Sequence, residues 1–301
     1  MFLCADFMIV SYTLAESDLG RTVYSILRRE LRISAALTRR LKAASAVYVS
    51  GAPAYTNHRP MPGETVAADI TAAEPPCGII PQQGPLDVLY ENEGLLALNK
   101  PVGIIVHPSR SRYTGTLSNF IAGYLGAGHS CHAVNRLDRD TSGVVLFAKN
   151  SYMKALASTA LADAAAVREY LALVHGAMPG RGVIDAPIKR LEERNLLRVT
   201  AEDGQRAVTH FETACVFEAD AGRYSLVRLR LETGRTHQIR VHCLHIGHPV
   251  LGDKMYCTEE SAAMSHALGI ATQALHAQRL AFTDPLSGER LEITGPTPDD
   301  W

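Results

Sequence analysis

The segment AAEPPCGIIPQQGP, residues 72–85, constrains the fold more than any other stretch because it divides the chain. It is rich in Pro and Gly and shows no hydrophobic periodicity, which favours a linker over a helix or a strand. A chain of 301 residues is long enough for two domains with their own cores. We therefore expect a small module over residues 12–72, a linker over 73–85 and a larger domain over 86–301.

The N-terminal part predicts two short helices followed by two short strands. Apolar residues recur at helical spacing within residues 18–44, and Ser34 suits the N-cap of the second helix. The strands are expected around 46–50 and 64–70. Residues 21–42 carry seven Arg or Lys against one acidic residue. This basic run is either a solvated helix face or a patch that binds phosphates.

The larger part is rich in strands, with helices interspersed unevenly. We expect strand, turn, strand, turn, strand over residues 87–108, helices over 116–127 and 151–166, strands over 143–150 and 168–176, and a helix in GRTHQIRVHCLHIGHP ended by Gly247 and Pro249. In RYSLVRLRLET apolar and charged residues alternate, as in a strand with one buried face. Because helices and strands do not alternate strictly, the pattern favours an α+β fold with a mixed, mostly antiparallel sheet.

Charge and cysteine content exclude some classes of protein. The formal net charge is −1, so binding to a nucleic acid would require a local basic patch. The six cysteines include no C-x-x-C pair, which indicates free thiols in a reducing compartment. No apolar run approaches the roughly 20 residues that cross a bilayer. The apolar start MFLCADFMIVSYTL has no basic n-region, so we expect a strand there and a cytoplasmic protein without a membrane partner.

Metal and nucleotide cofactors are not expected. Four histidines follow each other at His237, His242, His245 and His248, but His237 and His242 are five apart and no H-E-x-x-H motif is present. These histidines are better explained as capping, core or surface residues. GYLGAG, residues 123–128, does not match G-x-G-x-x-G, and no phosphate-binding G-x-x-x-x-G-K-[ST] motif occurs.

The stretch VNRLDRDTSGVVLFAKN, residues 134–150, places Asp138 between Arg136 and Arg139, just before a Thr-Ser-Gly turn. A pair of carboxylates for glycoside hydrolysis is one interpretation, since Asp138 and Asp140 would lie about 7 Å apart on one face of a strand. A lone nucleophilic aspartate is another, because an arginine within about 4–6 Å favours the ionised carboxylate. A structural Arg–Asp pair would give the same spacing, and all three interpretations remain open at this point.

The motif RLDRDTSG resembles the signature of RluA/RluD-type RNA pseudouridine synthases. Four further segments agree in order and spacing: LYENEGLLALNKPVGIIVHP, REYLALVHG, LETGRTHQIRVHCLHIGHPVLGD and ALHAQRLAFTDPLSGERLEI. Together the matches span roughly residues 86–295. Residues 12–72 are similar to the alpha-L RNA-binding domain, although Ser45–Ala46 replaces the usual glycine and VYVSG replaces the usual strand motif.

The resemblance implies which residues act. Asp138 would be the catalytic aspartate, Arg240 would pair with it, and Tyr170 would contact the target base and assist proton transfer. Arg136 would replace the everted nucleotide and Arg139 would neutralise phosphates. The module would bind RNA through Arg28, Arg29, Arg39 and Arg40.

The resemblance also implies an activity that needs no cofactor and no metal. Such enzymes isomerise uridine to pseudouridine in ribosomal or transfer RNA, and we expect base flipping, a monomer and no obligatory protein partner. Two positions depart from the family: Asn135 replaces a histidine, and Arg168 replaces a lysine. A catalytically inactive RNA-binding protein and a glycoside or nucleoside hydrolase are the competing classes.

Overall fold

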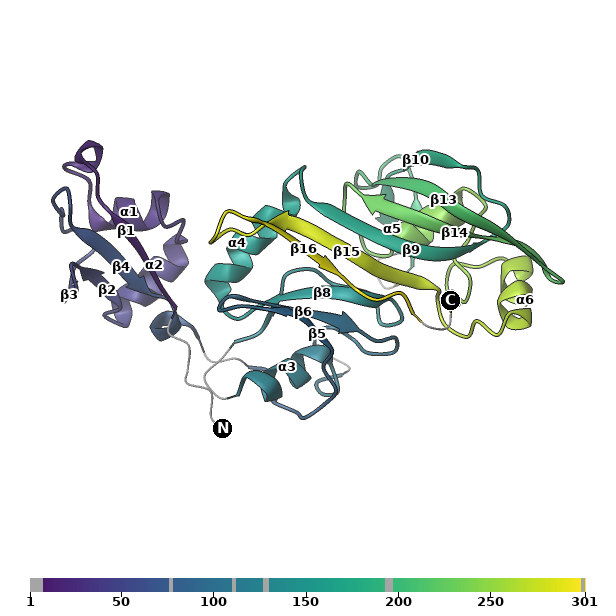
Figure 1. Cartoon of the computed structure of the whole chain (residues 1–301), viewed down its shortest axis with the longest axis horizontal. Helices are drawn as coiled ribbons and strands as arrows, with labels where there is room; N and C mark the ends of the chain where they lie inside the picture. The colour runs from purple at the N-terminus through teal and green to yellow at the C-terminus, as the bar shows by residue number, and fades with distance from the viewer. Residues whose placement is uncertain (1–7, 76–77, 110–111, 127–129, 193–196, 299–300) are drawn as a thin grey trace.

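The computed structural model describes residues 8–75, 78–109, 112–126, 130–192, 197–298 and 301. Figure 1 shows a small N-terminal unit beside a larger unit that is built around one long, twisted sheet. None of the helices in these residues is long and apolar enough to cross a membrane. Four of the six cysteines lie in the described part of the chain, and none of these four forms a disulfide: Cys131, Cys215, Cys243 and Cys257.

The N-terminal unit combines a four-stranded antiparallel sheet with two short helices. Its strands are β1 (Ile9–Thr13), β2 (Val47–Val49), β3 (Ala52–Pro53) and β4 (Thr65–Asp69), in the order β1-β4-β2-β3. The helices are α1 (Val23–Arg29) and α2 (Ala35–Ala43). Ser34 caps α2 as expected, because its hydroxyl accepts a hydrogen bond from the Leu37 amide at 3.1 Å.

The larger unit contains a ten-stranded sheet with the strand order β10-β13-β14-β9-β15-β8-β6-β5, to which β16 and β7 add at β15 and β8. Its strands are β5 (Val88–Glu91), β6 (Leu95–Lys100), β7 (His132–Ala133), β8 (Ser142–Ala148), β9 (Val167–His175), β10 (Arg181–Asp185), β13 (Val208–Ala219), β14 (Gly222–Leu231), β15 (Leu275–Thr283) and β16 (Arg290–Thr294). A separate two-stranded sheet pairs β11 (Ile188–Arg190) with β12 (Arg198–Thr200).

The expected α+β class with a mixed, mostly antiparallel sheet is confirmed. Within the described strands, β8 and β15 form the one parallel pair, and the other pairs are antiparallel. The predicted alternation in β14 is also present: Val227 and Leu229 are buried while Arg228 and Arg230 are exposed.

Two helices cover opposite faces of the sheet where β6 and β8 meet. Along β8, Val144 and Leu146 belong to the core that contains α4 (Ser151–Ala162), whereas Val145 and Phe147 belong to the core that contains α3 (Leu117–Leu125). Because successive residues of a strand point to opposite faces, every residue of β8 is buried. The strand that follows the Asp138 turn is therefore held firmly on both sides.

The structure corrects two expected elements and adds a helix that was not expected. No strand forms over residues 104–107, because β6 already pairs with β5 and β8 on its two edges and the carbonyls of Ile105 and Val106 instead accept hydrogen bonds from the first amides of α3. Helix α4 ends at Ala162 rather than 166, since the Ala166 amide bonds to Asp163 in a turn. The helix α6 (Glu259–Ala267), capped by Thr258, was not predicted.

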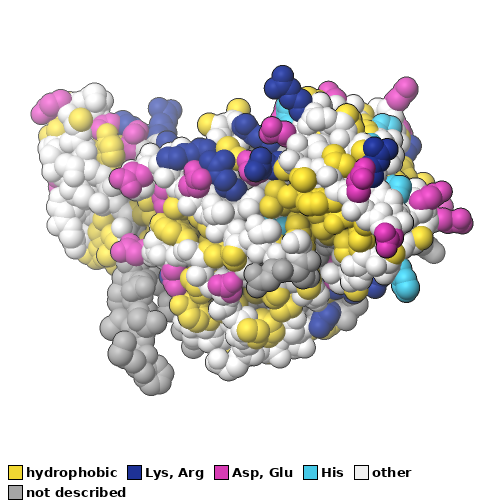
Figure 2. All heavy atoms as spheres, turned by 45° about the vertical axis from the view of Figure 1, so that its right-hand side comes forward, with side chains coloured by type: hydrophobic (Ala, Val, Ile, Leu, Met, Phe, Trp, Pro, Cys, Tyr) yellow, Lys and Arg dark blue, Asp and Glu magenta, His cyan; other side chains and the backbone are white. Residues whose placement is uncertain are grey.

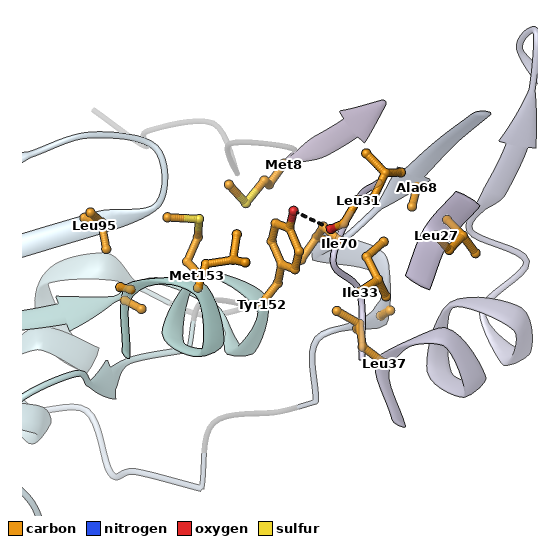
Figure 3. Close-up of a cluster of buried hydrophobic side chains, with 14 of the residues drawn as sticks. Met8, Leu27, Leu31, Ile33, Leu37, Ala68, Ile70, Leu95, Tyr152 and Met153 are labelled. Atoms are coloured by element: carbon orange, nitrogen blue, oxygen red, sulfur yellow. Dashed lines mark hydrogen bonds between the residues drawn. The ribbon is translucent and has the colours of Figure 1, made fainter. Parts of the chain in front are cut away.

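A continuous apolar cluster joins the two units. Figure 3 shows Met8, Leu31 and Ile33 of the N-terminal unit packed beside Tyr152 and Met153 at the start of α4. The Tyr152 hydroxyl donates a hydrogen bond to the Leu31 carbonyl at 2.9 Å. The N-terminal unit is therefore packed against α4 rather than merely tethered to it.

The segment expected to act as a linker also makes defined contacts. Glu74 accepts hydrogen bonds from the amide and hydroxyl of Ser151 at 3.1 and 2.7 Å and lies 2.9 Å from His132 Nε2. Burial alone would raise the pKa of Glu74, but these hydrogen bonds outweigh it and lower the pKa below its usual value. Further along, the Gln82 side chain accepts from the Gly115 amide ahead of α3 at 2.6 Å.

Candidate active site

Asp138 lies in a tight turn that leads into the central strand β8. The Thr141 amide donates to the Asp138 carbonyl at 3.3 Å, which closes the turn. The side chains of Thr141 and Ser142 do not close the turn, because they bond to β15 and to the segment that precedes it. The Thr141 hydroxyl accepts from Gln273, and the Ser142 hydroxyl lies 2.8 Å from His276 Nδ1.

Gly143 is required where β8 meets β15. Its φ is +103°, and a Cβ built there would lie 2.2 Å from the Ala277 carbonyl oxygen. The two backbones approach at the parallel pair of strands, so a larger residue would push the Asp138 turn away from the sheet.

Arg240 binds Asp138 from a helix about a hundred residues later in the chain. It belongs to the first turn of α5 (Gln238–His245), and its Nη1 donates to Asp138 Oδ2 at 2.8 Å. The Asp138 side chain is 28% exposed, so a solute can reach it. Its Oδ1 accepts no hydrogen bond from any described residue and lies 3.9 Å from His237 Nε2. Oδ1 is thus the atom available for chemistry.

Asp253 holds Arg240 from the side opposite Asp138. Arg240 Nε donates to Asp253 Oδ2 at 2.6 Å and Nη2 donates to Oδ1 at 2.8 Å. The ring of Tyr256 covers the guanidinium, with its centroid 4.9 Å from Cζ. Burial alone would lower the pKa of Arg240, but the carboxylates of Asp253 and Asp138 raise it further above its ordinary value. The guanidinium is therefore fixed in plane and orientation as well as charged.

His237 stands at the entrance to α5, beside Asp138. Its φ of +57° is in the left-handed region, and its Nδ1 lies 2.8 Å from the Tyr256 hydroxyl. Burial lowers the pKa of His237 and outweighs the opposing effect of the Asp138 carboxylate. The ring is therefore neutral at pH 7 and adds no second positive charge next to Asp138.

Lys100, at the end of β6, holds the Asp138 turn through its ammonium group. It is fully buried, and its ammonium donates to the carbonyls of Pro101, Ile104 and Arg139 at 2.8, 2.9 and 2.8 Å. Burial lowers the pKa of Lys100 to about 8, against the opposing effect of Asp140 and Asp138. The bond to the Arg139 carbonyl ties the residue after Asp138 to the end of β6.

Tyr170 faces Asp138 from β9, across a cleft of about 1210 Å³ that both residues line. Burial raises the pKa of Tyr170 to about 12. The phenol is therefore protonated at neutral pH, so it can donate a hydrogen bond or a proton but cannot serve as a base. Its ring remains available for stacking against a flat ligand.

Positive charge dominates the lining of the cleft. Six Lys or Arg side chains line it: Arg136, Lys154, Arg168, Arg190, Arg198 and Arg235. Asp138 is the single Asp or Glu among the described residues that line it. On the face of the molecule that Figure 2 turns to the viewer, by contrast, positive and negative charges are mixed, because Asp and Glu lie among the Lys and Arg side chains. The cleft suits a polyanion with a reactive centre at Asp138.

The structure separates Asp140 and Arg139 from the cleft lining. Arg139 donates to both carboxylate oxygens of Asp140, at 2.8 to 3.2 Å, and neither residue lines the cleft. Asp138 and Asp140 therefore do not form a pair of catalytic carboxylates in this cleft. Asn135 does line the cleft, but its Oδ1 accepts a hydrogen bond from the Leu146 amide at 2.7 Å.

The four arginines expected to bind RNA in the N-terminal module have different surroundings. Arg40 donates to the Ala73 carbonyl at 3.0 Å and to the Ser151 hydroxyl at 2.8 Å, at the joint between the units. Arg28, Arg29 and Arg39 are exposed, although Arg28 also donates to the Ile33 carbonyl. Arg29 and Arg39 are thus the two exposed arginines of this set whose side chains make no hydrogen bond or ion pair with a described residue.

The histidines considered as metal ligands lie apart. His242 is buried and bonds to Thr209 and the Ala186 carbonyl, His245 bonds to Thr200, and His248 to the His175 carbonyl. Across the described residues, no three His, Cys, Asp or Glu side chains are grouped as metal ligands would be.

Sequence reasoning missed several residues of the site, namely Asp253, Tyr256, Lys100 and Lys154. Asp253 ends the segment that carried the resemblance, yet nothing in its spacing shows that it meets Arg240. The one available signal was LGDKMY, a turn with an acidic residue shortly after the helix that holds Arg240.

Comparison with known families and proteins agrees with this geometry. The family described as RNA pseudouridylate synthase matches residues 94–245. The uncharacterized RNA pseudouridine synthase YhcT of Bacillus subtilis is 35% identical over 289 residues, which cover 95% of this chain and 92% of that protein. Ribosomal large subunit pseudouridine synthase D of Xanthomonas campestris is 38% identical over 248 residues, covering 79% of this chain and 73% of that protein.

A solved structure of a protein with a similar name also matches this chain. The human protein RNA pseudouridylate synthase domain containing 1 matches with a TM-score of 0.59 and 27% identity, over 72% of this chain and 86% of that one. Its name and those of the two bacterial proteins describe one activity.

Proposed function

This chain belongs to the RNA pseudouridine synthase family and is an RNA pseudouridine synthase, and from that premise we propose that Asp138 converts a uridine everted from a structured RNA. The observation that carries the proposal is the single carboxylate of a cation-lined cleft, held through Oδ2 by Arg240 while Oδ1 remains open. The relatives named for the large ribosomal subunit favour ribosomal RNA as the substrate, with transfer RNA as the other candidate.

The reaction requires the base to leave its stack. It breaks the bond between C1′ of the ribose and N1 of uracil, forms a bond between C1′ and C5, and moves the C5 proton to solvent while N1 gains a proton. Everting the nucleotide costs a few kcal/mol. Arg136 can neutralise the flanking phosphate, and the ring of Tyr170 offers a stacking surface of the kind worth about 1–3 kcal/mol per base.

Asp138 Oδ1 begins the reaction, either by attack on the sugar or base or by removal of a sugar proton. Arg240 keeps the carboxylate oriented toward the cleft through a charge-assisted hydrogen bond. Tyr170, protonated at neutral pH, is suited to give a proton or a hydrogen bond to the detached base. The residues alone supply this chemistry, without a cofactor.

The division of the chain is part of the proposal. Residues 12–72 act as an RNA-binding module, residues 73–85 as the connection and residues 86–301 as the catalytic domain of a monomer. The packing between the module and α4 supports a fixed placement of Arg29 and Arg39 relative to the cleft.

Tritium release tests the proposal. RNA labelled with tritium at C5 of uridine, as large-subunit ribosomal RNA and as transfer RNA, is incubated with the wild type and with Asp138→Asn. We expect release by the wild type and none by the variant, with RNA of unchanged mass and RNA binding within a few-fold. Equal release by both proteins would remove Asp138 from the mechanism, and free uracil as product would indicate a hydrolase.

A further inference from the structure

His237 has one ring nitrogen bound within the protein and one that is open to the cleft. Its Nδ1 lies 2.8 Å from the Tyr256 hydroxyl, whereas its Nε2 makes no hydrogen bond with a described residue. The side chain is 14% exposed and lines the cleft beside Asp138. Nε2 is therefore available to a ligand, and the position of the ring proton decides which ligand atom it can bind.

The contacts of Tyr256 fix the tautomer of His237. The Arg198 amide donates to the Tyr256 hydroxyl oxygen at 2.8 Å. The hydroxyl has one hydrogen of its own, and His237 Nδ1 is the acceptor within its reach among the described residues. Burial lowers the pKa of His237, so the ring is neutral at pH 7. Because Nδ1 accepts, the proton is on Nε2, the nitrogen that faces the Asp138 carboxylate.

His237 Nε2–H and Asp138 Oδ1 thus place a donor and an acceptor side by side, with 3.9 Å between the two heavy atoms. This distance is longer than the ~2.7–3.2 Å of a direct hydrogen bond. Each group is also held from its other side, the ring by Tyr256 and the carboxylate by Arg240, at 2.8 Å in both cases. The pair therefore suits a ligand atom that accepts from Nε2–H and donates to Oδ1.

The chemistry of uridine identifies that atom. A hydroxyl accepts and donates at once, whereas uracil O2 and the ring oxygen O4′ only accept and would turn their lone pairs toward the Asp138 carboxylate. The 2′-hydroxyl is the one free hydroxyl of a uridine within an RNA chain. A reacting carbon must lie about 3–3.5 Å from Oδ1. Because the 2′-hydroxyl is bonded to C2′, next to C1′, it lies close to Oδ1 both in an attack on C1′ and in removal of the C2′ proton.

We propose that His237 donates a hydrogen bond from Nε2 to the 2′-hydroxyl of the reacting uridine, which in turn donates to Asp138 Oδ1. The assignment rests on the proposed function, since it places that uridine over Asp138. His237 then selects ribose over deoxyribose, because a deoxynucleotide leaves Nε2–H without this acceptor. Tyr256 is a positioning residue: its hydroxyl sets the tautomer of His237, and its ring covers the Arg240 guanidinium.

Tritium release from paired transcripts tests the proposal. Large-subunit ribosomal RNA and transfer RNA are transcribed with either uridine or 2′-deoxyuridine, labelled with tritium at C5, and the readout is the ratio of the single-turnover rates on the ribose and deoxyribose transcripts. Any effect of the missing hydroxyl on the RNA or on the glycosidic bond cancels when this ratio is compared between proteins. In His237→Asn we expect a ratio about tenfold smaller than in the wild type, the upper end for one hydrogen bond. Asparagine suits the left-handed backbone of this position, but its amide does not extend to the place of Nε2.

Three further variants separate the hydrogen bond from a general effect on structure. His237→Gln carries an amide that extends to the place of Nε2, so it should restore most of the ratio. Tyr256→Phe keeps the ring over Arg240 but removes the hydrogen that sets the tautomer, so it should lower the ratio even if His237→Asn is too slow to time. His245→Asn, exposed on the same helix and outside the cleft lining, is the matched control and should leave the ratio unchanged.

The tautomer can be measured in the wild type without any RNA. In the nitrogen NMR spectrum of protein with isotope-labelled histidines, the signals that vanish in His237→Gln should show a proton on Nε2 and none on Nδ1. A proton on Nδ1, or the same ratio in the wild type, His237→Asn and Tyr256→Phe, would overturn the proposal. Failure of the wild type to release tritium from any uridine transcript would instead overturn the proposed function, while the spectrum would still report the tautomer of His237.

Discussion

Asp253 holds Arg240 by two parallel hydrogen bonds, of 2.6 and 2.8 Å, and leaves only the Nη1 edge of the guanidinium for Asp138. Both side chains are almost completely buried. The arginine is thus shared between a carboxylate that fixes it and a carboxylate that faces the cleft. Asp253 therefore acts on the reaction only indirectly, because it holds Arg240, which in turn orients the carboxylate of Asp138.

Asp253→Asn should therefore impair both stability and catalysis. An amide cannot accept two charge-assisted hydrogen bonds, so Arg240 loses its in-plane support. Breaking a buried ion pair by altering one partner typically costs about 3–5 kcal/mol, and urea unfolding measures that loss. Single-turnover tritium release should slow far more than RNA affinity falls. Asp203→Asn, which alters an exposed pair with Lys189, is the control and should change neither quantity.

Tyr170→Phe should separate stacking from proton transfer. Phenylalanine keeps the ring but removes the hydroxyl, so RNA affinity should stay within a few-fold of the wild type. If the hydroxyl gives a proton or hydrogen bond to the base, single-turnover release should slow by about 10²-fold. The wild-type rate should show no dependence on the ionisation of Tyr170 below pH 10, because burial raises its pKa to about 12. An unaltered rate in Tyr170→Phe would assign the residue to stacking alone.

Lys100 should give the folded protein a measurable dependence on pH. Burial lowers its pKa in the folded state to about 8 from 10.5, so between these values the folded protein binds fewer protons than the unfolded chain. Stability must then increase with pH in this window, by up to about 3 kcal/mol for the full difference. The free energy of unfolding of the wild type and of Lys100→Met should be measured at the same series of pH values between about 7.5 and 10. Parallel curves for the two proteins would contradict the assignment.

The N-terminal arginines should divide into two groups. Arg29→Ala with Arg39→Ala should weaken RNA binding and flatten its salt dependence without changing stability, since both side chains are exposed. Arg40→Ala should instead loosen the joint with α4, because Arg40 bonds to Ala73 and Ser151. Limited proteolysis between the units measures the second effect. Identical behaviour of both variants in the two assays would show that the joint does not depend on Arg40.

Much of the fold was accessible from sequence because its signals are local. The alternation along β14, the N-cap at Ser34 and the unbroken apolar run of β8 each depend on residues within one element. The failed strand over residues 104–107 has an apolar sequence too. It is not a strand because both edges of β6 are already occupied, and that is a property of the whole sheet.

The site divides in the same way. Sequence by itself determined the turn that presents Asp138, the helix that carries Arg240 and the strand that carries Tyr170, because each is encoded by a short motif. Only the tertiary structure decided that Asp253 takes two edges of Arg240, that Asp140 turns to Arg139 and that Lys154 faces the same cleft as Asp138. Periodicity and spacing do not record which side chains meet in the folded chain, whether the partners are adjacent, as Arg139 and Asp140 are, or lie on separate elements, as Lys154 and Asp138 do.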